Sequence, residues 1–312
     1  MKKWLLGLVS VVAATTLVAC SATDTSDKAS TKKEGDKLEV VASYSIIADM
    51  VENVGGDKVN VTSIVTRGTD PHMYEPTPED TLNVEKADIL FYNGMNLETG
   101  KGWFKKLLEN ARKEDVAFLV TEGIEPEHLT EEGKENEEDP HAWLSLANGM
   151  IYVDNITKRL IEIDPDNKDY YEKNHDRYQE KLAALHEEAK EKMAAIPEEQ
   201  RILVTSEGAF KYFSKAYDLH AEYIWEINTD NQGTPEQMTR ITDIVNSGNV
   251  KALFVETSVS PKTMKAVAAQ TKVDIYDTVF TDSLAKEGET GDTYYDMMKW
   301  NIDTIHDGLT QE

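Results

Sequence analysis

The tripeptide Asp-Pro-His occurs twice in this chain, as Asp70-Pro71-His72 and as Asp139-Pro140-His141. Proline restricts its own φ and pushes the preceding residue into extended backbone, so each histidine leaves a turn in a set direction. An imidazole that is aimed before a metal ion arrives makes a good ligand. One such turn is uninformative, but two copies among seven histidines predict a shared metal-binding role.

Two carboxylates occupy comparable positions in the second half of the chain. Glu207 follows the apolar run Ile202–Thr205, and Asp282 follows Val279-Phe280. Open α/β sheets bind ligands beyond the carboxyl ends of their strands, so we expect these residues and the two histidines to face a common cleft. Two imidazoles and two carboxylates are harder than a Cys/His zinc site and softer than an all-oxygen calcium site. A helix N-cap or a first-turn acid is the alternative role for each carboxylate.

The elements that would position these side chains follow an α/β pattern, in which short β-branched runs alternate with longer helical stretches. In the first half the pattern predicts strands at Leu38–Ala42, Val61–Val65, Ile89–Tyr92 and Val116–Val120, and helices at Ile46–Val54, Pro78–Lys86, Trp103–Arg112 and Asn148–Ile161. It restarts with strands at Ile202–Thr205, Ala221–Trp225, Ala252–Val255 and Val273–Asp277, and helices at Phe210–Tyr217, Pro235–Ser247, Pro261–Thr271 and Tyr294–His306. The restart predicts two lobes, each with a parallel-type sheet flanked by helices.

One unusually long helix is predicted between the two lobes. Pro165 and Pro197 bracket a stretch without glycine or proline. Its apolar residues recur at helical spacing, at Tyr171, Tyr178, Leu182, Leu185, Ala189, Met193 and Ile196. At 1.5 Å per residue such a helix would be about 45 Å long. We expect it to be a rigid connection that limits closure of the lobes on a ligand.

The N-terminus has the features of a targeting segment. Lys2 and Lys3 precede an apolar stretch that is short for a membrane span and ends in Leu17-Val18-Ala19-Cys20, which resembles a bacterial lipobox. Cys20 is the only cysteine, and we expect it to be the lipidated residue. The predicted organisation is a signal peptide (1–19), the lipidated cysteine with a flexible tether (20–36), an N-terminal lobe (37–164), a linking helix (165–197) and a C-terminal lobe (198–312).

Charge and motifs exclude several other functions. The formal net charge of −25 argues against nucleic acid as a partner. The segment His186-Glu187-Glu188-Ala189-Lys190 has lysine where the helical zinc-protease pattern requires a second histidine. The single cysteine at the anchor excludes cysteine nucleophile chemistry. We therefore expect that the protein is not an enzyme.

With these residues in hand, the chain resembles the metal-binding lipoproteins of bacterial ABC importers, the cluster A-I solute-binding proteins. It is most similar to the manganese-type, adhesin-like members from Gram-positive bacteria, and the resemblance covers nearly the whole chain. The segments that carry it are Leu17-Val18-Ala19-Cys20, Asp70-Pro71-His72-Met73-Tyr74-Glu75-Pro76, Asn93-Gly94-Met95-Asn96-Leu97-Glu98, Asp139-Pro140-His141-Ala142-Trp143-Leu144, Thr205-Ser206-Glu207-Gly208-Ala209-Phe210, Trp225-Glu226-Ile227-Asn228-Thr229 and Thr281-Asp282-Ser283.

The resemblance implies two α/β lobes joined by a rigid helix, with a metal in the interlobe cleft. By motif its ligands fall on His72, His141, Glu207 and Asp282. In zinc-type relatives a third histidine usually replaces the glutamate, and a long His-rich loop stands where this chain has Glu125–Asp139. Both departures favour Mn²⁺ as the bound ion. Zn²⁺ is the expected competitor, since N/O sites tend to bind zinc more tightly than manganese.

The function that this resemblance implies is a lipid-anchored receptor on the extracellular face of the cell membrane. It would capture Mn²⁺ as a monomer and deliver it to a membrane permease driven by a cytoplasmic ATPase, both on separate chains. The alternatives are a zinc or ferrous iron receptor of the same importer type, and a surface adhesin in which the metal is structural. A metallohydrolase is disfavoured, because it would need an open coordination position and a general base beside the ion.

Overall fold

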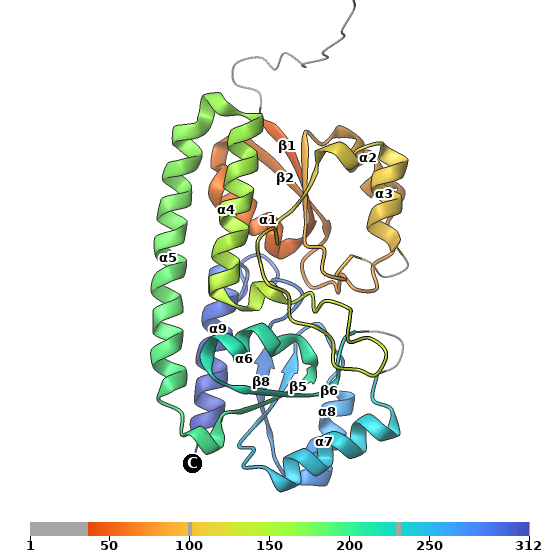
Figure 1. Cartoon of the computed structure of the whole chain (residues 1–312), viewed down its shortest axis with the longest axis vertical. Helices are drawn as coiled ribbons and strands as arrows, with labels where there is room; N and C mark the ends of the chain where they lie inside the picture. The colour runs from red at the N-terminus through yellow and green to blue at the C-terminus, as the bar shows by residue number, and fades with distance from the viewer. Residues whose placement is uncertain (1–36, 99–101, 229–231, 312) are drawn as a thin grey trace, which may run out of the picture. The chain divides into compact units, whose positions relative to one another are not determined.

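The computed structural model describes residues 37–98, 102–228 and 232–311, so the predicted signal peptide, Cys20 and tether lie outside the described residues. Figure 1 shows the helices and strands. The strands are β1 (Leu38–Tyr44), β2 (Val59–Val65), β3 (Ile89–Tyr92), β4 (Ala117–Leu119), β5 (Ile202–Glu207), β6 (His220–Trp225), β7 (Leu253–Glu256) and β8 (Ile275–Val279). The α-helices are α1 (Ser45–Gly55), α2 (Pro78–Lys86), α3 (Trp103–Ala111), α4 (Leu146–Ile163), α5 (Lys168–Ala194), α6 (Lys211–Tyr217), α7 (Pro235–Ser247), α8 (Lys262–Thr271) and α9 (Tyr294–Thr310).

The strands form two four-stranded sheets, and these define a first lobe (β1–β4) and a second lobe (β5–β8). The first sheet has the order β2-β1-β3-β4 and the second has the order β6-β5-β7-β8, with every pairing parallel. In both, the chain goes from a central strand to one neighbour and then returns to the other. This places a switch point between β1 and β3 and another between β5 and β7, where open sheets bind ligands. The predicted fold class is confirmed.

Local sequence signals explain where several helices begin. Thr77 caps α2 and exchanges hydrogen bonds with Asp80, and Thr234 caps α7 and exchanges them with Gln237. In both helices a proline follows the cap, at the position where its missing N–H costs nothing. These boundaries depend on residues at most three apart, which is why they can be predicted from sequence.

The long helix α5 contacts both lobes along its length (Figure 1). In its first half Asn174 Nδ2 donates to Val54 O of α1, at 3.0 Å. In its second half a 3.0 Å hydrogen bond joins His186 Nδ1 to the Tyr217 hydroxyl of α6. A single continuous helix packed on both lobes resists bending, which supports the predicted rigid connection. Within the described ranges, no helix combines the length and apolarity needed to cross a bilayer.

Some element ends differ from the predicted ones because tertiary contacts set them. The linking helix is 27 residues long, about 40 Å, because Pro165–Asn167 form a separate 3₁₀ turn before it. Strand β5 extends two residues further than predicted, since Glu207 still pairs with Trp225 of β6. Because of this extension, Glu207 is part of the sheet and not of a loop.

A buried aspartate of α1 in the first lobe is hydrogen-bonded to α9 of the second lobe and to α5. Asp49 Oδ2 accepts a hydrogen bond from Tyr294 N, the first residue of α9, at 3.0 Å. It also accepts one from the Tyr178 hydroxyl of α5 at 3.4 Å. Burial raises the pKa of Asp49 to about 6. The raised pKa means that the charged carboxylate costs stability at neutral pH.

We predict that Asp49→Asn stabilises the metal-free protein at pH 7.5 by about 1–3 kcal/mol, the range set by a pKa difference between about 6 and 3.8. The stability that the protonated group contributes is complete below pH 3.8 and is lost as pH rises through about 6. The difference in the free energy of unfolding between variant and wild type should therefore be about half as large at pH 5 as at pH 7.5. Urea unfolding at both pH values checks this. A variant less stable than wild type at pH 7.5 would mean that the carboxylate's hydrogen bonds outweigh its burial cost.

Candidate metal centre

The four residues predicted as metal ligands lie together between the two lobes. His72 lies in the loop after β2, and His141 lies in the turn before α4. Glu207 is the last residue of β5, and Asp282 lies in the loop after β8. One ligand atom from each lies within 4.8 Å of the others, and all four residues are buried. Among the described residues this is the one group of at least three His, Cys, Asp or Glu that gathers in this way. Their role as ligands remains a prediction.

The two imidazole nitrogens lie close to each other and to one oxygen of each carboxylate. His72 Nε2 and His141 Nε2 are 3.4 Å apart, and each lies 3.7 Å from Glu207 Oε1. Asp282 Oδ1 lies 3.8 Å from the first nitrogen and 3.5 Å from the second. Four ligands placed tetrahedrally at 2.0–2.2 Å from an ion would be about 3.3–3.6 Å apart. The observed distances of 3.4–3.8 Å are close to this range.

Both Asp-Pro-His turns are braced by their own aspartates. His72 N donates to Asp70 Oδ1 at 2.8 Å, and His141 N donates to Asp139 Oδ1 at 3.0 Å. From the sequence, the proline in each turn is the expected cause of the orientation of the imidazole. The structure adds a hydrogen bond across each turn, so two independent restraints aim each ring.

His141 has further support on its side away from the site. Its Nδ1 lies 2.9 Å from Asp139 Oδ1, which makes Nδ1 the protonated nitrogen and leaves Nε2 free to bind an ion. Asn93 Nδ2, just after β3, donates to Pro140 O at 2.9 Å. The Tyr212 hydroxyl of the second lobe donates to Asp139 O at 2.8 Å. Backbone and side chain of this turn are therefore both held.

Glu207 is held by the backbone around it and is not a helix cap. Its Oε1 accepts from Asn228 N at 2.6 Å, and its own N–H donates to Glu256 Oε1 at 2.7 Å. The short helical turn that follows has no side-chain cap bond, so the alternative capping role is wrong. Glycine is required at 208, because a Cβ there would lie 2.9 Å from Glu226 O.

Asp282 belongs to the second lobe by sequence but is flanked by contacts with the first. Trp143 Nε1 donates to Thr281 O at 2.8 Å, and Gly68 N donates to Ser283 Oγ at 2.6 Å. The residues on both sides of Asp282 are thus tied to the first lobe. Its position depends on the two lobes being together.

The charges in the site are strongly coupled. Burial raises the pKa of Glu207 well above its usual value, and the nearby Asp282 charge adds to this. Burial also acts to raise the pKa of Asp282, but the two imidazoles outweigh it and hold that pKa well below its usual range. Burial lowers the pKa of His141, but Asp139 outweighs it, so this pKa is well above its ordinary value. A bound cation would therefore compete with protons for Glu207 and His141.

The donor set fits a divalent transition metal. Glu207 Oε2 and Asp282 Oδ1 are buried, and neither has a hydrogen-bond partner among the described residues. A buried polar atom without a partner is costly, and a cation among these residues would satisfy Asp282 Oδ1, which lies 3.5–3.8 Å from the two imidazole nitrogens. Two nitrogen and two or more oxygen ligands suit Mn²⁺ or Zn²⁺ better than Ca²⁺ or Mg²⁺.

Three further residues, none of them among the predicted ligands, shape the site. Glu256 ends β7 beside Glu207, and burial raises its pKa to about 7. Ser258 Oγ donates to Asp282 Oδ2 at 3.1 Å, and Asn228 Nδ2 lies 3.4 Å from the same oxygen. The strand-end rule that selects Glu207 also points to Glu256, since both follow predicted strands. No local signal marks Ser258.

Comparison with known proteins assigns the family. The family described as ZnuA, zinc-uptake complex component A, periplasmic, matches residues 40–308. The chain belongs to this family. The resemblance stated from the motifs is thereby confirmed, and the ZnuA-family match spans both lobes and the linking helix.

Relatives of this ZnuA-family chain include streptococcal lipoproteins. The manganese ABC transporter substrate-binding lipoprotein ScaA of Streptococcus gordonii is 52% identical, over 100% of both chains. The manganese ABC transporter substrate-binding lipoprotein PsaA of Streptococcus pneumoniae is 49% identical over 95% of this chain and 94% of its own.

Solved structures of similar proteins have the same fold. The Mn-bound periplasmic metal-binding protein of Candidatus Liberibacter asiaticus is 32% identical, with a TM-score of 0.79 over 88% of this chain and 100% of its own. The periplasmic zinc-binding protein TroA of Treponema pallidum is 29% identical, with a TM-score of 0.82 over 89% of this chain and 100% of its own.

Proposed function

We propose that this protein is a lipid-anchored solute-binding protein that captures Mn²⁺ outside the cell and delivers it to an ABC importer. The observation that carries the proposal is the buried group of His72, His141, Glu207 and Asp282, with carboxylate oxygens that lack protein partners. The permease and the ATPase would be separate chains. The manganese transporter names of the relatives that are about half identical support the same assignment.

The choice of Mn²⁺ over Zn²⁺ rests on the ligand types. Two carboxylates can each bind through one or both oxygens, which allows more than four ligand atoms around the ion. Zn²⁺ prefers four ligands and gains from an additional imidazole. The loop Glu125–Asp139 has one histidine, so it offers little to gather zinc. Zinc remains the expected competitor on affinity alone, and one similar structure is named a zinc-binding protein.

The arrangement favours binding and release over catalysis. Four protein ligands that are 0–4% exposed leave little room for a substrate or an activated water at the ion. The manganese-transporter names of the relatives favour the receptor over the adhesin alternative. The experiment that tests the function is the metal content of protein purified from cells grown with Mn and Zn both available, combined with Mn²⁺ uptake in a deletion strain. Loss of Mn²⁺ uptake is expected. A purified protein without Mn, and uptake that is unchanged by the deletion, would contradict the proposal.

Mn²⁺ affinity is predicted to fall as pH falls. Only neutral imidazoles bind the ion, and the pKa of His141 is raised above its ordinary value of 6.5, so protons already compete near neutral pH. Each expelled proton weakens binding by up to about tenfold per pH unit below the pKa. Competition titrations between pH 8 and pH 5 measure this. A flat profile would mean that the histidines do not bind the ion.

Anchoring is predicted to depend on Cys20. Replacing it with alanine removes the thiol that would carry the acyl chains, and two or more chains are needed for a stable anchor. The Cys20→Ala protein should be found in the medium or remain unprocessed at the membrane. Fractionation with a mass measurement of the mature N-terminus checks this. Normal processing and anchoring of the variant would rule out the lipobox.

A further inference from the structure

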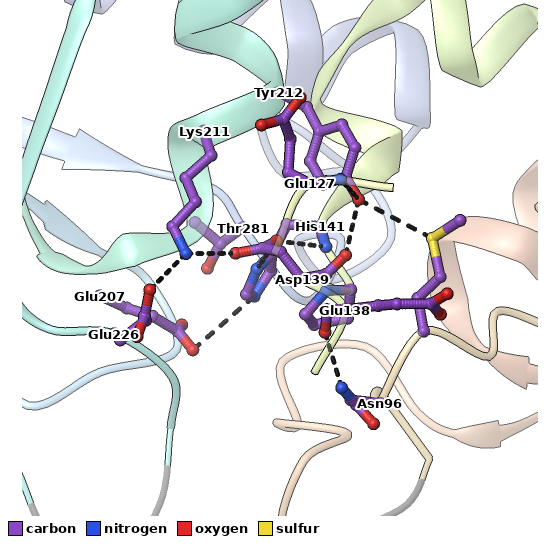
Figure 2. Close-up of polar contacts among 12 residues, drawn as sticks. Asn96, Glu127, Glu138, Asp139, His141, Glu207, Lys211, Tyr212, Glu226 and Thr281 are labelled. Atoms are coloured by element: carbon purple, nitrogen blue, oxygen red, sulfur yellow. Dashed lines mark hydrogen bonds and ion pairs between the residues drawn. The ribbon is translucent and has the colours of Figure 1, made fainter. Parts of the chain in front are cut away.

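Side chains of the second lobe make hydrogen bonds and an ion pair with the loop that leads to His141. We call this contact the clasp, and define it as Lys211, Tyr212 and Glu226 of the second lobe against residues 127–131 and Asp139 of the first. Figure 2 shows Glu127, Asp139, Lys211, Tyr212 and Glu226 of the clasp beside His141. All of the residues that form the clasp lie outside the ligand set.

Glu226 holds the tip of the loop. Its Oε1 accepts from Thr130 N at 2.5 Å, and its Oε2 accepts from Glu131 N at 2.7 Å. The Glu226 carboxylate is itself paired with Lys211 Nζ at 2.5 Å. These bonds join the loop to the end of β6, so the loop is fixed when the two lobes are together.

Lys211 connects the Glu226 contacts to the proposed metal site. Its Nζ lies 3.2 Å from Asp139 Oδ2 and 3.2 Å from His128 O. Asp139 is fully buried; its Oδ1 pairs with His141, and Lys211 Nζ is the ion-pair partner of its Oδ2. Burial lowers the pKa of Lys211, but Asp139 and Glu226 outweigh it and keep the side chain charged.

The same aspartate holds His141. Asp139 Oδ1 is 2.9 Å from His141 Nδ1, while its other oxygen faces Lys211 (Figure 2). The order of contacts is therefore His141, Asp139, Lys211, Glu226. It begins at a predicted metal ligand of the first lobe and ends in the second lobe.

We propose that Lys211 is a positioning residue for metal binding, which reaches from the second lobe to hold Asp139 and thereby His141 in place. This inference rests on the proposed function. Loss of the ammonium would leave Asp139 Oδ2 without its ion-pair partner and loosen the His141 ring. The clasp would thus let a second-lobe side chain set the orientation of a first-lobe ligand without touching the ion itself.

The expected loss of Mn²⁺ affinity follows from the position of Lys211, which holds Asp139, the residue that orients His141. Replacing a group that orients a metal ligand typically lowers affinity by about 10–100-fold. Affinity differences among variants of one site lie mostly in the dissociation rate, so most of the change should appear as faster dissociation. We therefore expect Lys211→Met to raise the Kd for Mn²⁺ by about 10–100-fold, mainly through the dissociation rate.

The test compares Lys211→Met with Lys215→Met in the folded protein. Lys215 lies on the same helix and pairs with Glu127 of the same loop, but its side chain is 65% exposed and it has no contact with Asp139. Mn²⁺ Kd is measured by competition, and dissociation by stopped flow into excess chelator. Urea unfolding of the metal-free proteins measures any loss of stability. Lys215→Met should change the Kd less than about twofold, as expected for an exposed pair.

Two further variants separate positioning from simple destabilisation. Lys211→Arg keeps the charge and should stay within about threefold of wild type. In an Asp139→Asn background, where Lys211 has only its pair with Glu226 left, adding Lys211→Met should weaken binding less than about twofold. If Lys211→Met alone does not fold, this double variant and Lys211→Arg still decide the question.

Each result bears on a separate statement. An unchanged Kd in Lys211→Met, or an equal loss with and without Asp139→Asn, would overturn the role of Lys211. If wild type and Lys215→Met bind neither Mn²⁺ nor Zn²⁺, the proposed function itself fails. A large loss of Mn²⁺ affinity in the Lys211→Met single variant, with normal Mn²⁺ affinity in Lys215→Met, supports the proposal.

Discussion

Replacing His141 with alanine should weaken Mn²⁺ binding by roughly 100-fold or more, equivalent to about 2.7 kcal/mol. The substitution removes one of the predicted ligand atoms, which lies 3.4–3.7 Å from its three counterparts. It also leaves Asp139 buried beside an empty space, because that carboxylate pairs with His141 Nδ1 at 2.9 Å. Competition titration with Mn²⁺ measures the loss, and growth on limiting manganese shows its effect in cells.

His306→Ala is the matched control for this prediction. His306 lies near the end of α9, where its ring contacts the neighbouring Asp307. Its loss should leave the Kd within about twofold, as is usual for a surface substitution. If His141→Ala folds and binds Mn²⁺ as tightly as this control, the ion does not occupy the proposed centre.

Replacing Glu207 with histidine should move metal preference toward zinc. The change gives three imidazoles and one carboxylate, a set that suits four-coordinate Zn²⁺ and removes the oxygen-rich half of the site. We expect the ratio of Zn²⁺ to Mn²⁺ affinity to rise by roughly tenfold or more, which is about 1.4 kcal/mol. Paired competition assays for both ions on wild type and variant measure the ratio.

Glu207→Ala provides the comparison, because it removes a ligand without supplying another. Both affinities should fall in that variant, and the ratio should change less than in Glu207→His. Circular dichroism and unfolding curves establish that the variants retain the fold. An unchanged ratio in a folded Glu207→His protein would show that the second lobe supplies its ligand from another residue.

Much of this architecture could be predicted because it depends on neighbours in sequence. The capping pairs at Thr77 and Thr234 act over three residues, and the helical spacing of α5 repeats within one element. The positions of the four candidate ligands could be predicted from one further rule, that parallel sheets gather ligands at the carboxyl ends of their strands. The rule brought together His72 and Asp282, which are far apart in sequence.

The detailed environment of the site could not be predicted, since it depends on pairs that meet only after folding. Lys211 lies beside Asp139 although 72 residues separate them, and on the sequence it is an ordinary first-turn lysine. Gly68 donates to Ser283 across the lobes in the same way. No periodicity marks such pairs.

The sequence by itself therefore determined the two α/β lobes, the joining helix and the identity of the candidate ligands, because propensity, capping and strand-end placement are local properties. Only the tertiary structure decided that a second-lobe lysine stands behind a first-lobe histidine, and that the first lobe grips both sides of Asp282. These contacts join chain segments that approach each other only when the lobes pack, and their strength comes from the burial which that packing creates.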